Sequence, residues 1–310
     1  MRTALGTLNF LYRHKSTTEG PRSVFDAYVE SCKTRGQLPL FDTAYYYGDT
    51  QTDALLGMFL KDLDTDFDVS GKANPWLNND FESGSLGQLS REGLTRQVTA
   101  SLKNLGIPKF RTFFLHAYDH ETPLTETLET VDDLYRQEKF DSFGVSNFSA
   151  RNVLDVVEGL EFLTVCLDDY QGMYNMVSRK VEGVIPLIRD LGLTFWAYNL
   201  LAGGLLTGRY KNRAIVDTDP GRFHKNQIYQ DIFWKPALLK YVDFLEDPLR
   251  DSLGWLSCKS WMEPGDIAIL GASSPGQLAE QLKALQEPKM PRFLPDYTPD
   301  VQDASPEYYY

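Results

Sequence analysis

The chain has 310 residues, which is enough to bury a substantial core in one large barrel or in two smaller domains. Its formal net charge of −12 argues against nucleic acid or an anionic membrane surface as the main partner. Hydrophobic residues make up 42% of the chain and charged residues 24%, as in ordinary globular proteins, and no apolar run approaches the length of a membrane-spanning helix.

A strand followed by a helix recurs along the whole chain. The first four strands are expected at 5–10, 38–41, 67–72 and 112–116. The helices that follow them are expected at 23–34, 53–60, 91–105 and 125–138. The later strands are expected at 142–147, 164–167 running on to 171, 193–198 and 266–271, with helices at 150–158, 181–191 and 273–284. Helical patterns also fill 236–262, after a long loop rich in Gly, Arg and Lys that reaches about residue 226.

Eight strands alternating with helices predict a closed parallel barrel. Near-continuous apolar strands favour parallel pairing that is covered by helices. At this length a single-domain (β/α)₈ TIM barrel over residues 1–310 is the economical closure. The alternative, a doubly wound open sheet, would need a G-x-G-x-x-G turn after its first strand, and Gly6 and Gly20 do not make one.

Four polar residues stand at the ends of adjacent strands, where barrel enzymes carry their chemistry. Asp42 closes the second strand with Tyr47 just beyond it, Lys72 ends the third strand, and His116 ends the fourth. Each residue has a structural alternative: a satisfied buried Asp42, a loop-capping Tyr47, a solvated Lys72, and a His116 packed and bonded to His120. These alternatives do not explain why an acid, a phenol, an ammonium and an imidazole meet at one mouth.

The four groups suit proton transfer to a carbonyl oxygen. A phenol has an ordinary pKa of about 10, and a nearby ammonium is expected to lower the pKa of Tyr47. A carboxylate paired with Lys72 would hold that ammonium in place, and an imidazole beside the phenol can orient the carbonyl. No metal site is expected, because His116 and Asp42 lack supporting ligands at sensible spacing.

With their local sequences, Asp42, Tyr47, Lys72 and His116 resemble the tetrad of the aldo-keto reductase superfamily, whose members are (β/α)₈ barrels. The runs KANPW, YQGMYN and AGGLLTG narrow the resemblance to the aflatoxin-aldehyde reductase branch, and it extends from residue 5 to about 282. The resemblance implies reduction of an aldehyde or ketone with NADPH. It assigns proton donation to Tyr47, tuning of the phenol to Lys72 and Asp42, and orientation of the carbonyl to His116.

The resemblance also implies the residues that bind NADPH. Ser146, Asn147 and Gln171 match positions that hold the nicotinamide carboxamide, and Tyr198 matches the ring that stacks on the nicotinamide. The pyrophosphate loop, the basic loop after it and the segment around the adenosine 2′-phosphate supply the other expected contacts: Asn199, Leu201, Gly203, Gly204, Leu205, Gly208, Arg209, Arg222, Ser273, Gln277, Glu280 and Gln281.

The distribution of charge favours an anionic ligand independently of the resemblance. Between residues 209 and 225 the chain carries five basic residues, Arg209, Lys211, Arg213, Arg222 and Lys225, against the acidic Asp217 and Asp219. Barrels often bind phosphate after strands seven and eight, and Ser273-Ser274 precede a helix whose N-terminal amides suit an anion. A merely solvated basic loop is the alternative.

Aromatic residues are expected on the substrate side of the mouth: Tyr46, Trp76, Tyr118 and Tyr229. The Pro-rich tail, about 286–310, is expected to fold over or near this mouth. It ends in Glu307 and three tyrosines, where relatives that reduce succinic semialdehyde carry an arginine. These features favour a bulky, uncharged aromatic aldehyde or ketone, such as an intermediate of secondary metabolism, whereas a disordered tail would contribute nothing.

A small-molecule carbonyl is therefore the expected partner, without nucleic acid or membrane, and the sequence leaves a homodimer open. Three cysteines without metal-ligand spacing favour reduced thiols in the cytoplasm. The other function class left open is a cofactor-binding regulatory subunit like the potassium-channel β subunits, which share the fold and the tetrad. Those proteins usually carry an extra N-terminal segment, and the expected start of this chain at its first strand favours the enzyme.

Overall fold

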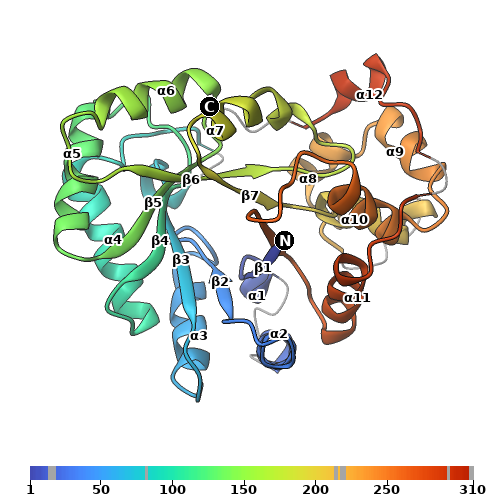
Figure 1. Cartoon of the computed structure of the whole chain (residues 1–310), viewed down its shortest axis with the longest axis horizontal. Coiled ribbons are helices and arrows are strands. Elements are labelled where there is room, and N and C mark those ends of the chain that lie inside the picture. The colour runs from blue at the N-terminus through green and yellow to red at the C-terminus, as the bar shows by residue number, and fades with distance from the viewer. Residues whose placement is uncertain (13–18, 81–82, 213–215, 217–220, 292–293, 307–310) are drawn as a thin grey trace.

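Eight parallel strands close into a barrel in the computed structural model of the chain, which describes residues 1–12, 19–80, 83–212, 216, 221–291 and 294–306 (Figure 1). Each strand pairs with its neighbours in the sequence, and the last pairs with the first. The strands are β1 (Arg2–Gly6), β2 (Leu40–Asp42), β3 (Asp68–Ala73), β4 (Phe110–Leu115), β5 (Phe140–Ser146), β6 (Leu167–Met173), β7 (Thr194–Tyr198) and β8 (Ile267–Leu270). The expected (β/α)₈ barrel is confirmed.

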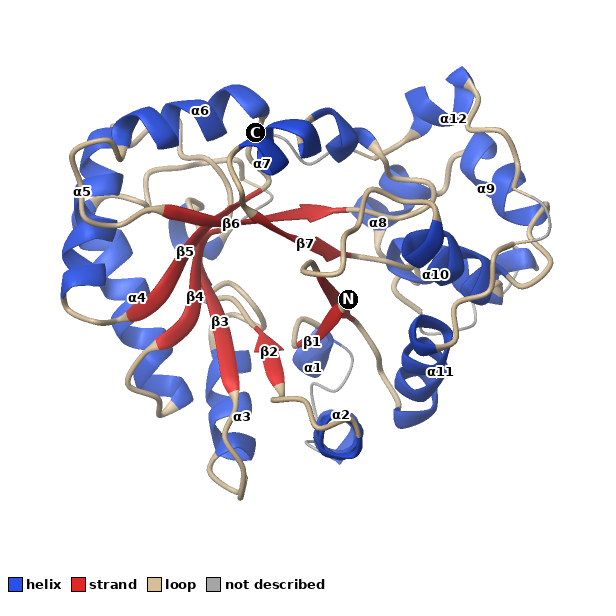
Figure 2. Ribbon diagram, in the orientation of Figure 1, coloured by secondary structure: helices blue, strands red, loops and turns tan. Residues whose placement is uncertain are grey.

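Helices surround the strands (Figure 2). They are α1 (Asn9–Tyr12), α2 (Glu19–Thr34), α3 (Gln51–Leu60), α4 (Arg91–Leu105), α5 (Leu124–Arg136), α6 (Ala150–Gly159), α7 (Ile185–Asp190), α8 (Gln227–Phe233), α9 (Pro236–Asp243), α10 (Pro248–Cys258), α11 (Pro275–Gln286) and α12 (Pro299–Ala304), with short 3₁₀ turns η1 (Leu77–Asn79), η2 (Lys180–Gly183), η3 (Ala202–Thr207) and η4 (Arg209–Lys211). Side-chain caps set several starts: Ser90 accepts from the amide of Gly93 in α4, and Ser149 accepts from that of Asn152 in α6.

Apolar side chains fill two regions. The larger core lies between the strands and the covering helices and includes Phe25, whose ring packs against the rings of Phe41 and Phe59. A smaller cluster contains Ala4, Leu40, Phe114, Trp196, Ile267 and Ile269, which come from β1, β2, β4, β7 and β8 and fill the interior of the barrel. The rigid packing of both layers fixes where each strand ends, and therefore where the polar residues at the strand ends lie.

Helices α3 and α4 approach each other closely at Gly57. A Cβ atom on Gly57 would lie 2.3 Å from the carbonyl oxygen of Asn104 and 2.9 Å from Cα of Leu105, so only glycine fits this contact without a shift of the backbone. Helix α3, which follows β2, therefore packs directly against α4.

Several expected boundaries are wrong. The first strand is Arg2–Gly6 rather than 5–10, because its register is set by hydrogen bonding to β8, which pairs Arg2 with Ile267. The sixth strand begins at Leu167 rather than 164. The pattern over 236–262 is split into α9 and α10, with Pro248 in the first turn of α10, and both α8 and the tail helix α12 were not expected.

The described part of the tail packs beside α9 (Figure 1). The guanidinium of Arg179 lies between two rings, 4.4 Å from the centroid of Trp255 and 4.3 Å from that of Tyr297. Lys235 Nζ donates to the carbonyl of Ala304 at 3.2 Å, which holds the end of α12. Residues 307–310 lie outside the described residues, so closure of the mouth by the tail stays a prediction. Within the described residues, no helix is long and apolar enough to cross a membrane.

Candidate functional site

A cavity of about 1880 Å³ opens among the loops that follow the C-terminal ends of the strands. Its lining includes Asp42 at the end of β2, His116 directly after β4, Ser146 at the end of β5 and Tyr198 at the end of β7. Parallel strands point their carboxyl ends to the same side of a barrel, so residues from distant parts of the chain meet there. The strand ends named from the sequence are thus brought to one site.

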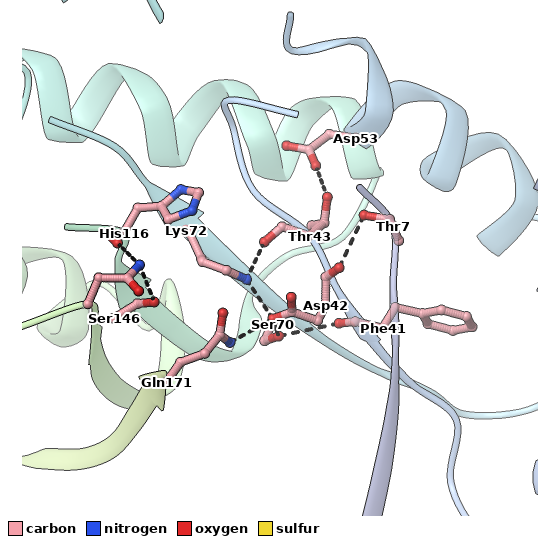
Figure 3. Close-up of polar contacts among 11 residues, drawn as sticks. Thr7, Phe41, Asp42, Thr43, Asp53, Ser70, Lys72, His116, Ser146 and Gln171 are labelled. Carbon is pink, nitrogen blue, oxygen red and sulfur yellow. Dashed lines mark hydrogen bonds and ion pairs between the residues drawn. The ribbon is translucent and has the colours of Figure 1, made fainter. Parts of the chain in front are cut away.

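A buried ion pair lies at the base of the site (Figure 3). Lys72 Nζ donates to Asp42 Oδ1 at 2.6 Å and to the main-chain carbonyl of Thr43 at 2.9 Å. Ser70 Oγ and Gln171 Nε2 donate to the same Asp42 oxygen at 2.9 and 3.0 Å. Burial lowers the pKa of Lys72, while the negative charge of Asp42 and its hydrogen bond act to raise it. The carboxylate therefore keeps the ammonium in one position and favours its charged form.

Tyr47 and His116 face each other above this pair. Their ring centroids are 5.9 Å apart in an edge-on arrangement, and Lys72 Nζ lies 5.8 Å from the centroid of the Tyr47 ring. Nδ1 of His116 is buried and has no hydrogen-bond partner among the described residues. His120, which could have satisfied it, instead packs its ring against Tyr118. His116 therefore has hydrogen-bonding capacity that the described protein groups leave unused.

The pKa values of this pair leave both side chains neutral. Burial, and secondarily the positive charge of Lys72, lower the pKa of His116 to about 3. Burial, followed by the negative charge of Asp42, raises the pKa of Tyr47 well above its ordinary value. The expectation that a nearby ammonium lowers the pKa of Tyr47 is wrong for this structure, because desolvation and the negative charge of Asp42 raise that pKa. A neutral phenol retains the proton that it would have to donate.

A hydrogen-bonded chain crosses the ends of three strands beside His116. Asn147 Nδ2 donates to the main-chain carbonyl of His116 at 3.0 Å and to Ser146 Oγ at 3.1 Å, and Tyr198 OH donates to Asn147 Oδ1 at 2.7 Å. Ser146, Asn147, Gln171 and Tyr198 all line the cavity. Hydrogen bonds among Ser146, Asn147 and Tyr198, and the one from Gln171 to Asp42, hold these side chains in place.

The loop after β7 is shaped by residues with positive φ. Gly203 and Gly204 have φ values of 65° and 102°, and the amide of Gly203 donates to Asn199 Oδ1 at 2.7 Å. Asn199, Leu201, Gly203, Gly204 and Arg209 line the cavity.

Two predicted members of this loop, Leu205 and Gly208, are not among the described lining residues. Leu205 is fully buried in the core, and Gly208 turns the chain with a φ of 77° against Pro248.

The segment after β8 and the basic loop form another part of the lining. Gln277 Oε1 accepts from the amide and the hydroxyl of Ser273, both at 2.9 Å, and the side chain of Ser274 caps α11. The cavity lining includes the predicted residues Ser273, Gln277, Glu280, Gln281, Arg209 and Arg222. Lys211 is tied to the carbonyl of Leu245 at 2.6 Å, and Arg213, Asp217 and Asp219 lie outside the described residues.

Three of the four predicted substrate residues reach the cavity. Tyr46, Trp76 and Tyr229 line it, and the rings of Tyr46 and Trp76 are 5.1 Å apart. Tyr118 is not among the described lining residues, because its ring packs instead against Phe148 at 5.3 Å and against His120.

Sequence reasoning missed part of the lining, most clearly Asn9. Asn9 Oδ1 accepts a hydrogen bond from the guanidinium of Arg222, which also lies 5.1 Å from the centroid of the Tyr229 ring. The first strand was predicted at 5–10, which places Asn9 inside the strand and not at its end. A strand ending at Gly6 would have placed Leu8 and Asn9 at the mouth.

Comparison with known proteins gives a consistent result. A model of the Aldo/keto reductase family matches residues 19–293. Aflatoxin B1 aldehyde reductase member 4 of Homo sapiens is 33% identical to this chain, over 92% of this chain and 88% of that protein. Aflatoxin B1 aldehyde reductase member 2 of Homo sapiens is 35% identical over 84% and 77%, and aldo-keto reductase pigE of Monascus ruber is 31% identical over 67% and 66%. These matches confirm the resemblance that the motifs indicated.

Proposed function

Because this chain belongs to the aldo/keto reductase family, we propose that it reduces an aldehyde or ketone to an alcohol with NADPH, with Tyr47 as the proton donor. The observation that carries the proposal is the meeting of Tyr47 and His116 above the buried Asp42–Lys72 pair, at the edge of one cavity. Together, an acid, a phenol, an ammonium and an imidazole suit the chemistry of a carbonyl group.

The residues of the cavity fit NADPH. Tyr198 and Asn147 supply a ring and an amide next to His116, which suits a nicotinamide, and Arg209 and Arg222 supply positive charge for phosphates in an acidic protein. The capped start of α11 adds main-chain amides for the 2′-phosphate. When bound, NADPH would supply the hydride to the carbonyl carbon.

The protein's own groups would manage the proton. Tyr47 keeps its proton because its pKa is raised, and it would release that proton only to the strongly basic oxygen of the developing alkoxide. Neutral His116 can donate a hydrogen bond to the same oxygen and so orient the carbonyl. The ammonium of Lys72 would then stabilise the tyrosinate, while Asp42 keeps that ammonium in place.

For the substrate, we propose a bulky, uncharged aromatic carbonyl. The rings of Tyr46, Trp76 and Tyr229 offer flat apolar surface at the cavity, which favours burial and stacking of an aromatic ligand. An intermediate of secondary metabolism would meet this description. The cytoplasm is the proposed location, in keeping with three free cysteines.

Turnover by the purified protein tests this proposal directly. NADPH oxidation should accompany reduction of an uncharged aromatic aldehyde with a higher kcat/KM than reduction of succinic semialdehyde. Binding of NADPH without turnover across a broad panel of aldehydes and ketones would point instead to a regulatory cofactor-binding subunit. A clear preference for succinic semialdehyde would contradict the substrate class and leave the reductase assignment standing.

A further inference from the structure

We propose that Asp53 is a positioning residue for proton transfer, which sets the place and the charge of Lys72 through Thr43. The inference rests on the proposed function and extends it to a helix that covers the barrel. Asp53 lies on α3, and neither the motifs nor the described lining of the cavity includes it.

The carboxylate of Asp53 joins three elements. Asp53 is only 1% exposed, and its two oxygens accept from Thr43 Oγ1 and from Ser101 Oγ on α4, both at 2.6 Å. Thr43 follows β2, and its main-chain carbonyl accepts from Lys72 Nζ at 2.9 Å. Figure 3 shows Asp53, Thr43 and Lys72 as successive members of one hydrogen-bonded row. The position of the carbonyl that holds Lys72 is therefore fixed from the outside of the barrel.

The charge of Asp53 acts on the same group. The ionisable side chains that face it are Lys72 from β3, with Asp42 and Tyr47 beyond, so two carboxylates surround one ammonium. The negative charge of Asp53 acts to raise the pKa of both Lys72 and Tyr47. Burial raises the pKa of Asp53 itself, whereas the hydrogen bonds from Ser101 and Thr43 act to lower it. The two bonds thus favour the ionised form that Lys72 requires.

The distinction between charge and mere packing can be made with two variants. Asp53→Asn keeps the size of the side chain and an oxygen that can accept from Thr43, but it removes the charge. Ser101→Ala removes the other hydrogen bond of Asp53, but at the high pH of the basic limb the carboxyl stays ionised and keeps its contact with Thr43. Both changes should cost stability, so stability by itself does not separate the two roles.

The test is the pH dependence of kcat for reduction in the wild type and both variants. We expect Asp53→Asn to move the basic limb of the profile to lower pH by roughly half a unit to one unit, because the pKa values of Lys72 and Tyr47 both fall. The Kd for NADPH should change less than about twofold, since Asp53 does not touch the cavity. Ser101→Ala should leave the basic limb where it is in the wild type.

A second measurement does not need turnover. The 13Cε resonance of Lys72, assigned with a Lys72→Met variant, reports the pKa of the ammonium, which should be lower in Asp53→Asn than in the wild type or in Ser101→Ala. An unchanged limb and an unchanged Lys72 titration in Asp53→Asn would overturn the inference, and so would equal shifts in both variants. Failure of the proposed function looks different, since the wild type itself would then reduce no carbonyl.

Discussion

Burial raises the pKa of Tyr47 but lowers the pKa values of Lys72 and His116. It removes the stabilisation that water gives to any charged form, so it keeps the proton on Tyr47 and keeps a second proton off His116. Lys72 is also buried, yet Asp42 lies 2.6 Å away and compensates part of the lost hydration. The site thus places one charged donor beneath two neutral ones.

Tyr47→Phe should abolish most of the reduction and leave cofactor binding nearly intact. The phenol is the proposed proton donor, and a general acid is typically worth about 10²–10⁴ in rate, so kcat should fall by that factor. The Kd for NADPH should stay within a few-fold. Tyr45→Phe is the matched control, because Tyr45 also loses a hydroxyl but is not among the described lining residues. Retention of half the wild-type kcat by Tyr47→Phe would refute the assignment.

His116 should contribute to the acid sensitivity of the fold. Its pKa is about 3 in the folded protein against about 6.5 in an unfolded chain, so only the unfolded chain takes up a proton between these values. The free energy of unfolding is then unaffected by this residue above pH 6.5 and falls as the pH decreases toward 3. His116→Asn should make the slope between pH 6 and 4 shallower, by at most about 1.4 kcal/mol per pH unit.

Urea unfolding at several pH values measures this slope. His120→Asn provides the control, because His120 is exposed on the neighbouring loop. An equal change of slope in the two variants would mean that burial of His116 is not the cause.

The contact between α3 and α4 supports the site from behind. Gly57 allows the two helices to approach, and the same approach brings Ser101 of α4 within 2.6 Å of Asp53 on α3. Asp53 in turn holds Thr43 directly after Asp42. Packing of two helices outside the barrel is therefore coupled to the position of the end of β2, where the proposed catalytic residue Asp42 lies.

Gly57→Ala should destabilise the protein although alanine is the better helix former. The new Cβ would meet main-chain atoms of α4 at 2.3 to 2.9 Å, and overpacking of this kind costs about 1–3 kcal/mol, more than the gain in helix propensity of about 1 kcal/mol. The midpoint of urea unfolding measures the change. Gly276→Ala in α11 has no neighbouring atom nearer than 4.0 Å and should be neutral or stabilising. Equal midpoints for the two variants would show that α3 and α4 can separate without cost.

At the scale of the whole molecule, the net charge of −12 repels a phosphorylated ligand. Binding of such a ligand then depends on local positive charge. Arg209, Arg222 and Lys225 all line the cavity, and the bond from Arg222 to Asn9 connects the loop after β7 to the start of the barrel. The fold thus brings these three cations together at one cavity.

Arg222→Ala should weaken NADPH binding more than NADH binding. A charge-assisted contact to phosphate is worth about 1.5–3 kcal/mol. The Kd for NADH divided by the Kd for NADPH should therefore fall by roughly 10- to 150-fold. Quenching of tryptophan fluorescence by each cofactor gives both constants. Lys240→Ala changes the net charge equally at an exposed site on α9 and controls for the overall field. Unchanged discrimination in Arg222→Ala would place recognition of the 2′-phosphate elsewhere.

The sequence by itself determined the alternation of strands and helices and the identity of the residues at the strand ends. Both are local properties: an apolar run predicts a buried strand, and the first polar residues after it must lie at the strand's mouth. The positions of Asp42, Tyr47, Lys72 and His116 at the strand ends were therefore predicted without the structure, and most of the residues predicted in the loops after β7 and β8 line the cavity. The family motifs pointed to the same positions.

Only the tertiary structure decided which distant groups meet. The end of β1 depends on pairing with β8, which lies about 265 residues away, and that pairing released Asn9 to contact Arg222. The same limit applies to Tyr118, which turns to Phe148 instead of the cavity, and to Asp53, which meets Ser101 only because two helices pack at Gly57. The raised pKa of Tyr47 and the lowered pKa of His116 also depend on the tertiary structure. Desolvation is set by what surrounds a group in space and not by its neighbours along the chain.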